Sequence, residues 1–595
     1  MSCQGNITIA GQTAPGGICF DAGEISFSSR ANIICRYIRI RPGSDTASTS
    51  DDSLGMYQTT NAILDHVSVG FGPYDNIDAV SSDAVSVQNC LDADPIGQQF
   101  GAHVESGGAW SWQYNIFANS HNRNPLAKTD DTFINNVEYN CSAGFTTHTS
   151  GHFSHDIVNN YFVAGPAYGG SSDFPWFQVD NNQSVYEPGN LFDGNDNGAL
   201  DGSTTTVYWY QGGSGGTVLS APWSSWTSLI PTVPAPLAWR YSVSAAGAFP
   251  RDDVDSLIIS QVKTLGNGTT GTGAGTTEPG SGLYTSQTQT GLANNGYGTF
   301  TGETAPANFS GDGIADYWKL ANNLSTNIAY PLTNTADGYT LLEHYLNFLG
   351  APHAVAQTNT PALINLAQFT AGFSSATFSV TNATNGTVSI VSGTNANFIP
   401  SANFSGLGNF TFNVSEGGYT LSAVVTVCVT PAAPPVSTTD FNGALVTVAT
   451  NAAATVTTPP NNLTWRGDGA ANVWNTTVSN WLNGDSLSLF KSGDVVTFDD
   501  TGSSAPAIDL NVTVFPGAIL FSNNQNYTLS GSGALAGSGA FSKTGGGIVT
   551  IGTTNSGYSG SIDINGGTVA LNPGTSIGSG ALTLRNGGTL SLPKP

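Results

Sequence analysis

Six short segments of the chain share one pattern: IICRYIRI (33–40), AILDHVSV (62–69), AVSVQNC (84–90), SWQYNIF (111–117), TFINNVEY (132–139) and DIVNNYFV (156–163). In each segment apolar and polar residues alternate, and a polar or Asn-rich corner lies at or near its end. Alternation of this kind indicates a β-strand with one buried face. Residues 33–163 are therefore predicted to form a series of short strands.

The corners recur with a period in the low twenties. Aligning His66, Asn89, Asn115, Asn136 and Asn160 gives separations of 23, 26, 21 and 24 residues, and an apolar residue follows each one. Such a period is typical of a parallel β-solenoid, in which each turn of the coil stacks on the last. Asn suits the corner because it tolerates the left-handed conformation and its amide can bond to the next rung. A β-sandwich is the alternative, but it would not need so regular a corner.

The composition favours a β protein of several domains. The chain has 595 residues, of which only 9% are charged and 73 are Gly, unlike a helix-rich cytosolic enzyme. Lys and Arg number 15 against 40 Asp and Glu, so no basic stripe is available for nucleic acid. No segment is long and apolar enough to cross a membrane.

The cysteines match no metal-ligand spacing and define no disulfide framework. The even spacing of Cys3, Cys19 and Cys35 is explained equally well by thiols that face into β-structure. The remaining three are Cys90, Cys141 and Cys428.

Basic residues are concentrated near the start of the chain. The first 130 residues contain Arg30, Arg36, Arg39, Arg41, Arg123 and Lys128. An acidic ligand would therefore be expected to bind in this region. The alternative, equally open for the first four, is that they are outward-facing strand residues or salt-bridge partners.

The domain prediction begins with a parallel β-helix over residues 1–302. Its opening reads as the middle of a domain, so the first rungs are expected to be missing. Residues from 164 to about 302 are irregular, with a Gly- and Thr-rich linker near 268–282. Residues 303–352 are predicted to be a short helical segment. Its carboxylates could bind calcium, but a helical hairpin capped by Asp explains them as well: Asp312, Asp316, Asp337 and Glu343.

The C-terminal side is predicted to consist of repeated β modules. Residues 353–432 resemble the cadherin-like modules of bacterial surface proteins and predict an Ig/cadherin-like β-sandwich. A linker is expected over 433–460. Residues 461–595 contain KTGGGIVTIGTTNSGYSGSIDINGGTVAL, which resembles the autotransporter-associated β-strand repeat and predicts a second solenoid.

The first region resembles the pectate lyase family, whose fold is a right-handed parallel β-helix. The segments NITIAGQTAPGGICF, RYIRIRPG, ILDHVSV and YNIFANSHNRNPLAK occur in the order that family shows, over residues 6–165. ILDH matches a Trp-Ile-Asp-His strand. Arg123, Pro125 and Lys128 match an Arg-x-Pro-x-x-Arg pattern with Lys in the last place.

The resemblance implies a secreted or cell-surface lyase that cleaves polygalacturonate, or a related polyuronate, by calcium-assisted β-elimination. Arg123 would be the base, Lys128 and His103 would bind substrate, and the calcium ligands would be Asp51, Asp52, Asp75 and Asp78. Arg123 could instead pair with Asp130 or Asp131, and the four Asp could be exposed turn residues. His66 is expected to be structural rather than a proton carrier.

Two departures from the family pattern bear on activity. Asn76 stands where relatives commonly have Glu, and Ala102 stands where Lys is common before the His. Their loss would imply weaker calcium binding, a different substrate or an inactive binding copy. The rival class is a non-catalytic extracellular carbohydrate-binding or adhesive protein on the same coil. Hydrolysis is disfavoured because no compact group of acids accompanies a suitable His.

Overall fold

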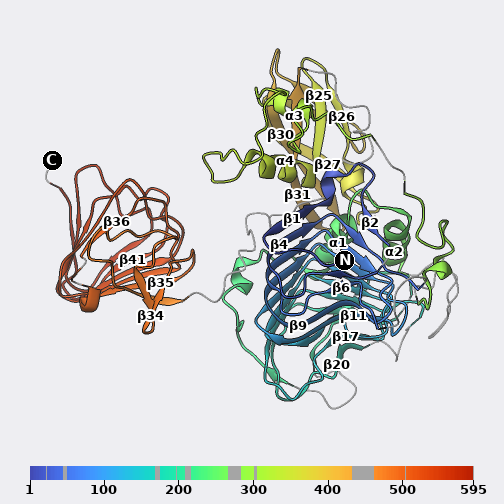
Figure 1. Ribbon diagram of the computed structural model, residues 1–595, viewed down its shortest axis with the longest axis horizontal. Helices are drawn as coiled ribbons and strands as arrows, with labels where there is room; N and C mark the ends of the chain where they lie inside the picture. The colour runs from blue at the N-terminus through green and yellow to red at the C-terminus, as the bar shows by residue number, and fades with distance from the viewer. Residues whose placement is uncertain are drawn as a thin grey trace. The chain divides into compact units, whose positions relative to one another are not determined.

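The structure is a computed structural model that divides into two compact units, residues 1–456 and 457–595 (Figure 1). It describes residues 1–21, 23–44, 50–167, 174–195, 197–207, 216–265, 283–300, 304–431, 461–502, 504 and 506–593. The predicted linkers near 268–282 and 433–460 lie outside these residues. Within the described ranges, no helix has the length and hydropathy that a membrane crossing needs.

The first unit is built on a coil of parallel strands with three faces. The first face contains β3 (Ile25–Ser26), β6 (Leu54–Gly55), the start of β9 (Asp75–Gln88), β11 (Phe100–Gly107), β14 (Leu126–Lys128), β17 (Ala143–Thr146) and β20 (Phe174–Phe177). The second contains β1 (Ile7–Ala10), β4 (Ala31–Arg36), β7 (Thr60–Asp65), the end of β9, β12 (Trp110–Gln113), β15 (Asp131–Ile134), β18 (Ser154–Val158), β21 (Ser184–Tyr186) and β24 (Thr217–Val218). The third contains β2 (Cys19–Phe20), β5 (Arg39–Ile40), β8 (Ser68–Gly70), β10 (Leu91–Ala93), β13 (Ile116–Ala118), β16 (Val137–Tyr139), β19 (Tyr161–Val163), β22 (Leu191–Asp193) and the antiparallel β23 (Ser203–Thr204).

The inside of the coil is an apolar core to which every rung contributes. Ring centroids of Trp112, Phe117, Phe133 and Phe145 follow one another at 5.8, 5.7 and 5.6 Å along the stack. Apolar burial of this extent is the main force that holds parallel rungs together. The prediction of a parallel β-helix is confirmed.

Each corner between the second and third faces uses two residues. The first has a left-handed backbone, with φ of 55° at His66, 52° at Asn89, 56° at Tyr114, 56° at Asn135 and 54° at Asn159. The residue after it points inward, and from Asn115 onward this residue forms a ladder of amides. The side chain of Asn115 donates to Asn136 (2.9 Å), Asn136 to Asn160 (3.2 Å) and Asn160 to Asn190 (2.9 Å).

The sequence alignment of the corners was therefore wrong by one residue between Asn89 and Asn115, because His66 and Asn89 both occupy the left-handed position. The strand register pairs Gln88 with Gln113, so Asn89 corresponds to Tyr114 and not to Asn115. The left-handed conformation and the amide ladder, both assigned to one Asn, belong to neighbouring residues.

Two helices that the sequence reading missed cover the third face. They are α1 (Ala235–Ala245) and α2 (Asp253–Thr264), in the region that was predicted to be irregular. Trp239 and Ile258 from these helices belong to one buried cluster with Ile116 of β13. Asp252 caps α2 by accepting from the main-chain N–H of Asp255, which is the usual role of Asp at that position.

Most of the early arginines are structural ion-pair partners. Arg41 pairs with Asp252 at 2.5 Å and with Asp255 at 2.6 Å, and all three side chains are almost fully buried. Arg39 pairs with Asp255 at 3.0 Å, and Arg36 with Asp65 at 2.8 Å. These guanidinium groups are engaged by the fold, so the salt-bridge alternative holds for them.

A short helical segment and a β-sandwich complete the first unit. The segment contains α3 (Asp316–Ala321) and α4 (Leu341–Gly350). One sheet of the sandwich has β25 (His353–Gln357), β31 (Tyr419–Thr430), β30 (Gly406–Glu416) and β27 (Thr377–Thr384) in that order, and the other has β26 (Ala362–Asn365), β29 (Asn395–Pro400) and β28 (Gly386–Ser392). Their facing side chains form a shared core that includes Phe398, Phe410 and Val425.

The carboxylates that suggested calcium in the helical segment have partners within the chain. Asp312 forms a fully buried ion pair of 2.7 Å with Lys319. Asp316 accepts from the main-chain N–H of Phe309, Asp337 lies 3.2 Å from His344, and Glu343 forms a capping box with Thr340. These contacts fit the alternative of a capped helical hairpin.

The second unit is a smaller parallel coil with its own core. One sheet contains β34 (Ser486–Ser488), β33 (Trp481–Asn483), β32 (Asn462–Trp465), β35 (Val495–Asp499), β37 (Ala518–Ser522), β39 (Ala540–Thr544), β41 (Ile562–Ile564) and β43 (Leu582–Leu584). The other contains β36 (Ala507–Asp509), β38 (Tyr527–Ser530), β40 (Ile548–Ile551), β42 (Thr568–Leu571) and β44 (Thr589–Ser591). Trp465, Trp474 and Trp481 pack together near the antiparallel β32, β33 and β34. The predicted second solenoid is confirmed, while its relation to autotransporter repeats and the domain boundaries stay predictions.

Candidate functional site

The predicted site residues are gathered on the first face by the strand register. Asp78 of β9 lies opposite His103 of β11, and Glu105 of β11 lies opposite Lys128 of β14. Because parallel rungs stack in register, side chains on the same face of successive strands form rows along the coil. Residues far apart in sequence are in this way brought to one surface.

Arg123 lies at the edge of this surface, on the turn before β14. Its Nη1 donates to both carboxylate oxygens of Asp75, at 3.0 and 2.7 Å, and its side chain stays 17% exposed. The guanidinium carbon lies 4.1 Å from the ring centroid of Phe100 and 5.5 Å from that of Tyr74. A charged hydrogen bond and two cation–π contacts thus fix the guanidinium.

The alternative partners proposed for Arg123 are occupied elsewhere. Asp131 is buried in an ion pair with His155, whose Nδ1 lies 2.7 Å from Asp131 Oδ1. Asp130 accepts from the main-chain N–H of Ser154 at 2.7 Å. The structural alternative named the wrong acids, since the partner of Arg123 is Asp75.

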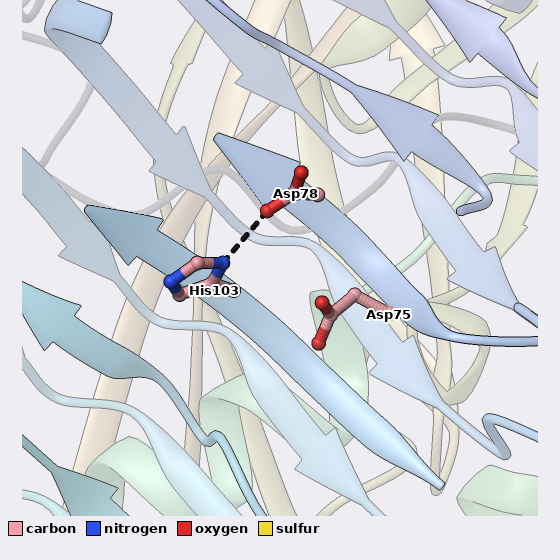
Figure 2. A group of neighbouring side chains, drawn as sticks. All are labelled: Asp75, Asp78 and His103. Atoms are coloured by element: carbon pink, nitrogen blue, oxygen red, sulfur yellow. Dashed lines mark hydrogen bonds and ion pairs between the residues drawn. The ribbon is translucent and has the colours of Figure 1, made fainter. Parts of the chain in front are cut away.

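A chain of polar contacts links the middle of the site to Lys128. His103 Nδ1 lies 2.7 Å from Asp78 Oδ1, and its Nε2 lies 3.2 Å from Glu105 Oε2 (the first contact is drawn in Figure 2). Lys128 Nζ donates to the same Glu105 oxygen at 2.6 Å. The hydrogen bond from Lys128, more than any other influence, lowers the pKa of Glu105.

Glu105 was missed by the sequence reading, although a signal for it was present. It follows His103 by two residues on a strand, and residues two apart on a strand point to the same face. The alternation in FGAHVESGG therefore places Glu105 beside His103.

Three of the groups are close enough to share one ion. One ligand atom from each of Asp75, Asp78 and His103 lies within 4.8 Å of the others (Figure 2). Residues three apart on a regular strand point to opposite faces, so the start of β9 departs from regular alternation. There the side-chain amide of Asn76 turns away from the site, donating to Asp92 at 2.7 Å and to the carbonyl of Ala93 at 3.0 Å.

Further carboxylates make this surface strongly acidic. Asp52 accepts from the main-chain N–H of Asp75 at 3.0 Å, and burial raises the pKa of Asp52 to about 7, with Asp78 and Glu24 adding to the effect. Burial also raises the pKa of Glu24, and the next cause is Asp51. Crowded carboxylates of this kind favour binding of a cation or of protons.

The carboxylate oxygens at this surface are suitable ligands for calcium. Calcium takes carboxylate and carbonyl oxygens as ligands, and Asp75, Asp78 and Asp52 offer carboxylates on one surface. The imidazole of His103 is not a ligand that calcium prefers. It fits better as the group that orients Asp78 through their hydrogen bond.

The two departures that seemed to weaken the site do not face it. Ala102 is fully buried in the core of the coil, and Asn76 is buried against Asp92. The side chain at position 102 therefore points into the core, away from the candidate site. His66 is 1% exposed and its ring stacks on Tyr37 at 4.6 Å, in keeping with a structural role.

Three curated proteins that are similar to this chain share the name probable pectate lyase C. Probable pectate lyase C of Aspergillus fumigatus is 32% identical over 353 residues, which is 58% of this chain and 78% of the fungal protein. The protein of the same name from Neosartorya fischeri is also 32% identical with the same coverage. That of Emericella nidulans is 29% identical over 357 residues, covering 59% of this chain and 79% of the relative.

A parallel coil with a row of acids and bases on one face, together with these relatives, defines the class as polysaccharide lyases of the parallel β-helix type. Within that class, the chain belongs to the pectate lyase family.

Two other similarities were found. Residues 350–428 match the family model of the bacterial Ig domain, which agrees with the sandwich seen there. A solved structure, pectate lyase C from Erwinia chrysanthemi at pH 9.5 with 30 mM Ca2+, is 15% identical, with 38% of this chain and 68% of that chain covered. Its TM-score is 0.25, which supports no conclusion about this chain.

Proposed function

We propose that the protein is a secreted lyase that cleaves polygalacturonate, or a related polyuronate, by calcium-assisted β-elimination. The observation that carries the proposal is the placement of Arg123 beside Asp75, next to Asp78 and His103 on one face of the coil. The names of the relatives supply the substrate class.

The reaction requires a base at carbon five of a uronate ring. Removing that proton breaks the C5–H bond, its electrons form the C4=C5 double bond, and the C4–O4 bond breaks with the electron pair going to the leaving oxygen. Arg123 is assigned as the base that takes the proton at a guanidine nitrogen, and water protonates the leaving oxygen. The partly exposed Arg123 can reach a ring lying on this face.

The neighbouring residues hold the substrate and the base. Lys128 is assigned to the uronate carboxylate as a point charge, and its contact with Glu105 holds the ammonium at the surface. His103 orients Asp78 and borders the substrate. Calcium, when bound to Asp52, Asp75 and Asp78, would withdraw electron density from the substrate carboxylate and supply positive charge near Arg123.

Phe100 and Tyr74 hold the Arg123 side chain in one place. The proton at carbon five is then met by a group of fixed position, which reduces the entropic part of the barrier.

The test is the ultraviolet absorbance of the unsaturated uronide formed from polygalacturonate with calcium present. Arg123→Ala is expected to lower kcat by roughly a thousandfold or more, the size seen for loss of a general base, and Arg123→Lys is expected to recover little of it. Arg585→Ala is the matched control, because Arg585 is an exposed arginine of the second unit. Product formation by Arg123→Ala at the wild-type rate would refute the assignment. No product from wild type on several polyuronates, with binding retained, would favour the non-catalytic carbohydrate-binding alternative.

A further inference from the structure

A row of aromatic side chains borders the site, one from each of three successive rungs. The ring centroids of Tyr74 and Phe100 lie 5.8 Å apart at 89°, and those of Phe100 and His121 lie 6.2 Å apart at 21°. Tyr74 is 37% exposed, His121 is exposed, and Phe100 between them is half-buried. The row is therefore open to solvent at both ends.

Strand register places this row along the coil axis, beside the acidic residues. Phe100 lies opposite Asp75, and it bridges to Asn122 on the next rung. The main-chain N–H of His121 donates to the carbonyl of Gln99, so His121 is one rung beyond Phe100. A linear ligand lying over Asp78 and His103 along the coil would have the aromatic row at its side.

The row is continuous with the candidate site through Arg123. The guanidinium carbon lies 4.1 Å from the ring centroid of Phe100 and 5.5 Å from that of Tyr74. Tyr74 and His121 are the exposed rings on either side of Phe100. Partial desolvation of the otherwise exposed His121 side chain lowers its pKa, which favours the uncharged imidazole.

The chemistry of this surface matches a uronate chain. The C–H faces of a pyranose ring are apolar and pack on aromatic rings, whereas its carboxylate requires a cation. Tyr74 and His121 supply the rings, and Arg123 and Lys128 supply the cations. A ligand with one of these properties alone would use only half of the surface.

We infer that Tyr74 and His121 form a sugar-stacking platform that binds the uronate rings on either side of the ring held at Arg123. This inference rests on the proposed function for its ligand class. It adds a role in chain-length preference, because only an oligomer longer than the reacting pair would reach both rings.

Calorimetric titration with hexagalacturonate and digalacturonate at one calcium concentration tests the platform, because binding needs no turnover. Tyr74→Ala and His121→Ala are each expected to weaken hexagalacturonate binding roughly threefold to tenfold, the size expected for one aromatic contact. Digalacturonate spans the ring at Arg123 and only one neighbouring ring, so its binding should weaken in at most one of the two alanine variants. Tyr74→Phe, which keeps the ring, should bind like wild type. Phe309→Ala is the matched control, because Phe309 is a 78% exposed aromatic residue in the helical segment.

Several results would overturn the inference: unchanged hexagalacturonate affinity in both alanine variants, an equal loss for digalacturonate in both alanine variants, or an equal loss in Tyr74→Phe. Wild type that does not bind hexagalacturonate would overturn it too. If Tyr74→Ala does not fold, His121→Ala decides alone, because the His121 side chain is exposed. Failure of the proposed function is recognised separately, as binding without formation of unsaturated product.

Discussion

Asp92→Asn is predicted to stabilise the coil at pH 8 and to have little effect at pH 4. Asp92 is on β10, 4% exposed, and points into the coil, where one carboxylate oxygen accepts from Asn76. Its other oxygen has no hydrogen-bond partner among the described residues. Burial raises the pKa of Asp92 from 3.8 to about 7, so near neutral pH the folded protein holds a proton that the unfolded chain has lost.

The sign and size of the effect follow from proton linkage. Between pH 3.8 and about 7 the folded state binds more protons than the unfolded state, so the free energy of unfolding falls as pH rises through this window. The difference between the two pKa values corresponds to about 4 kcal/mol at most. Asn keeps the acceptor for Asn76 and cannot ionise, so the variant should escape this loss.

Unfolding in guanidinium chloride, followed by circular dichroism at several pH values, would measure this change in the free energy of unfolding. The expected result is a free energy of unfolding above pH 7 that exceeds wild type by up to about 4 kcal/mol, with a flatter pH profile. Asp21→Asn, at an exposed carboxyl, is the control and should follow wild type. Identical pH profiles for wild type and Asp92→Asn would refute the reasoning.

Three further predictions concern the architecture. Asn136→Ala removes one step of the amide ladder and should lower the free energy of unfolding by about 2–4 kcal/mol, measured by urea denaturation. An equal loss of stability in Asn403→Ala, at an exposed Asn, would contradict this prediction. Arg41→Met leaves the buried Asp255 without its closest cation and should lower the free energy of unfolding by about 3–5 kcal/mol. Faster proteolysis within α2 is the expected result, and proteolysis at the wild-type rate would contradict a stabilising role of the ion pair. Residues 461–595 expressed alone should fold, since they contain a complete core, and a missing cooperative thermal transition would show that they depend on the first unit.

The strands of the coil were predictable, whereas the details of its corners were not. Alternation with a period of two is a direct consequence of burying one face, so segments such as TFINNVEY could be recognised without a structure. The corner residues could not be aligned correctly, because rung lengths vary and a polar residue fits either place. Only the hydrogen-bonded register separates Asn89 from Asn115.

The helices and part of the site depended on tertiary contacts. α1 is rich in small residues and is held by packing against the third face, so its own propensity gave a weak signal. The sequence motif identified Arg123, and the alternative structural interpretation paired it with Asp130 or Asp131, which are close in the chain. The true partner, Asp75, comes from two rungs earlier, and proximity across rungs is invisible before the register is known.

The amide ladder also shows how this coil can change without disturbing the face that holds the candidate site. Asn115 and Asn136 are joined across 21 residues, while Asn160 and Asn190 are joined across 30, and both pairs have a 2.9 Å hydrogen bond. The two separations differ by nine residues, yet the amides stack in the same way. The length of a turn can therefore vary while the register that brings Arg123 to Asp75 is kept, so loops beside the candidate site can differ without altering its geometry.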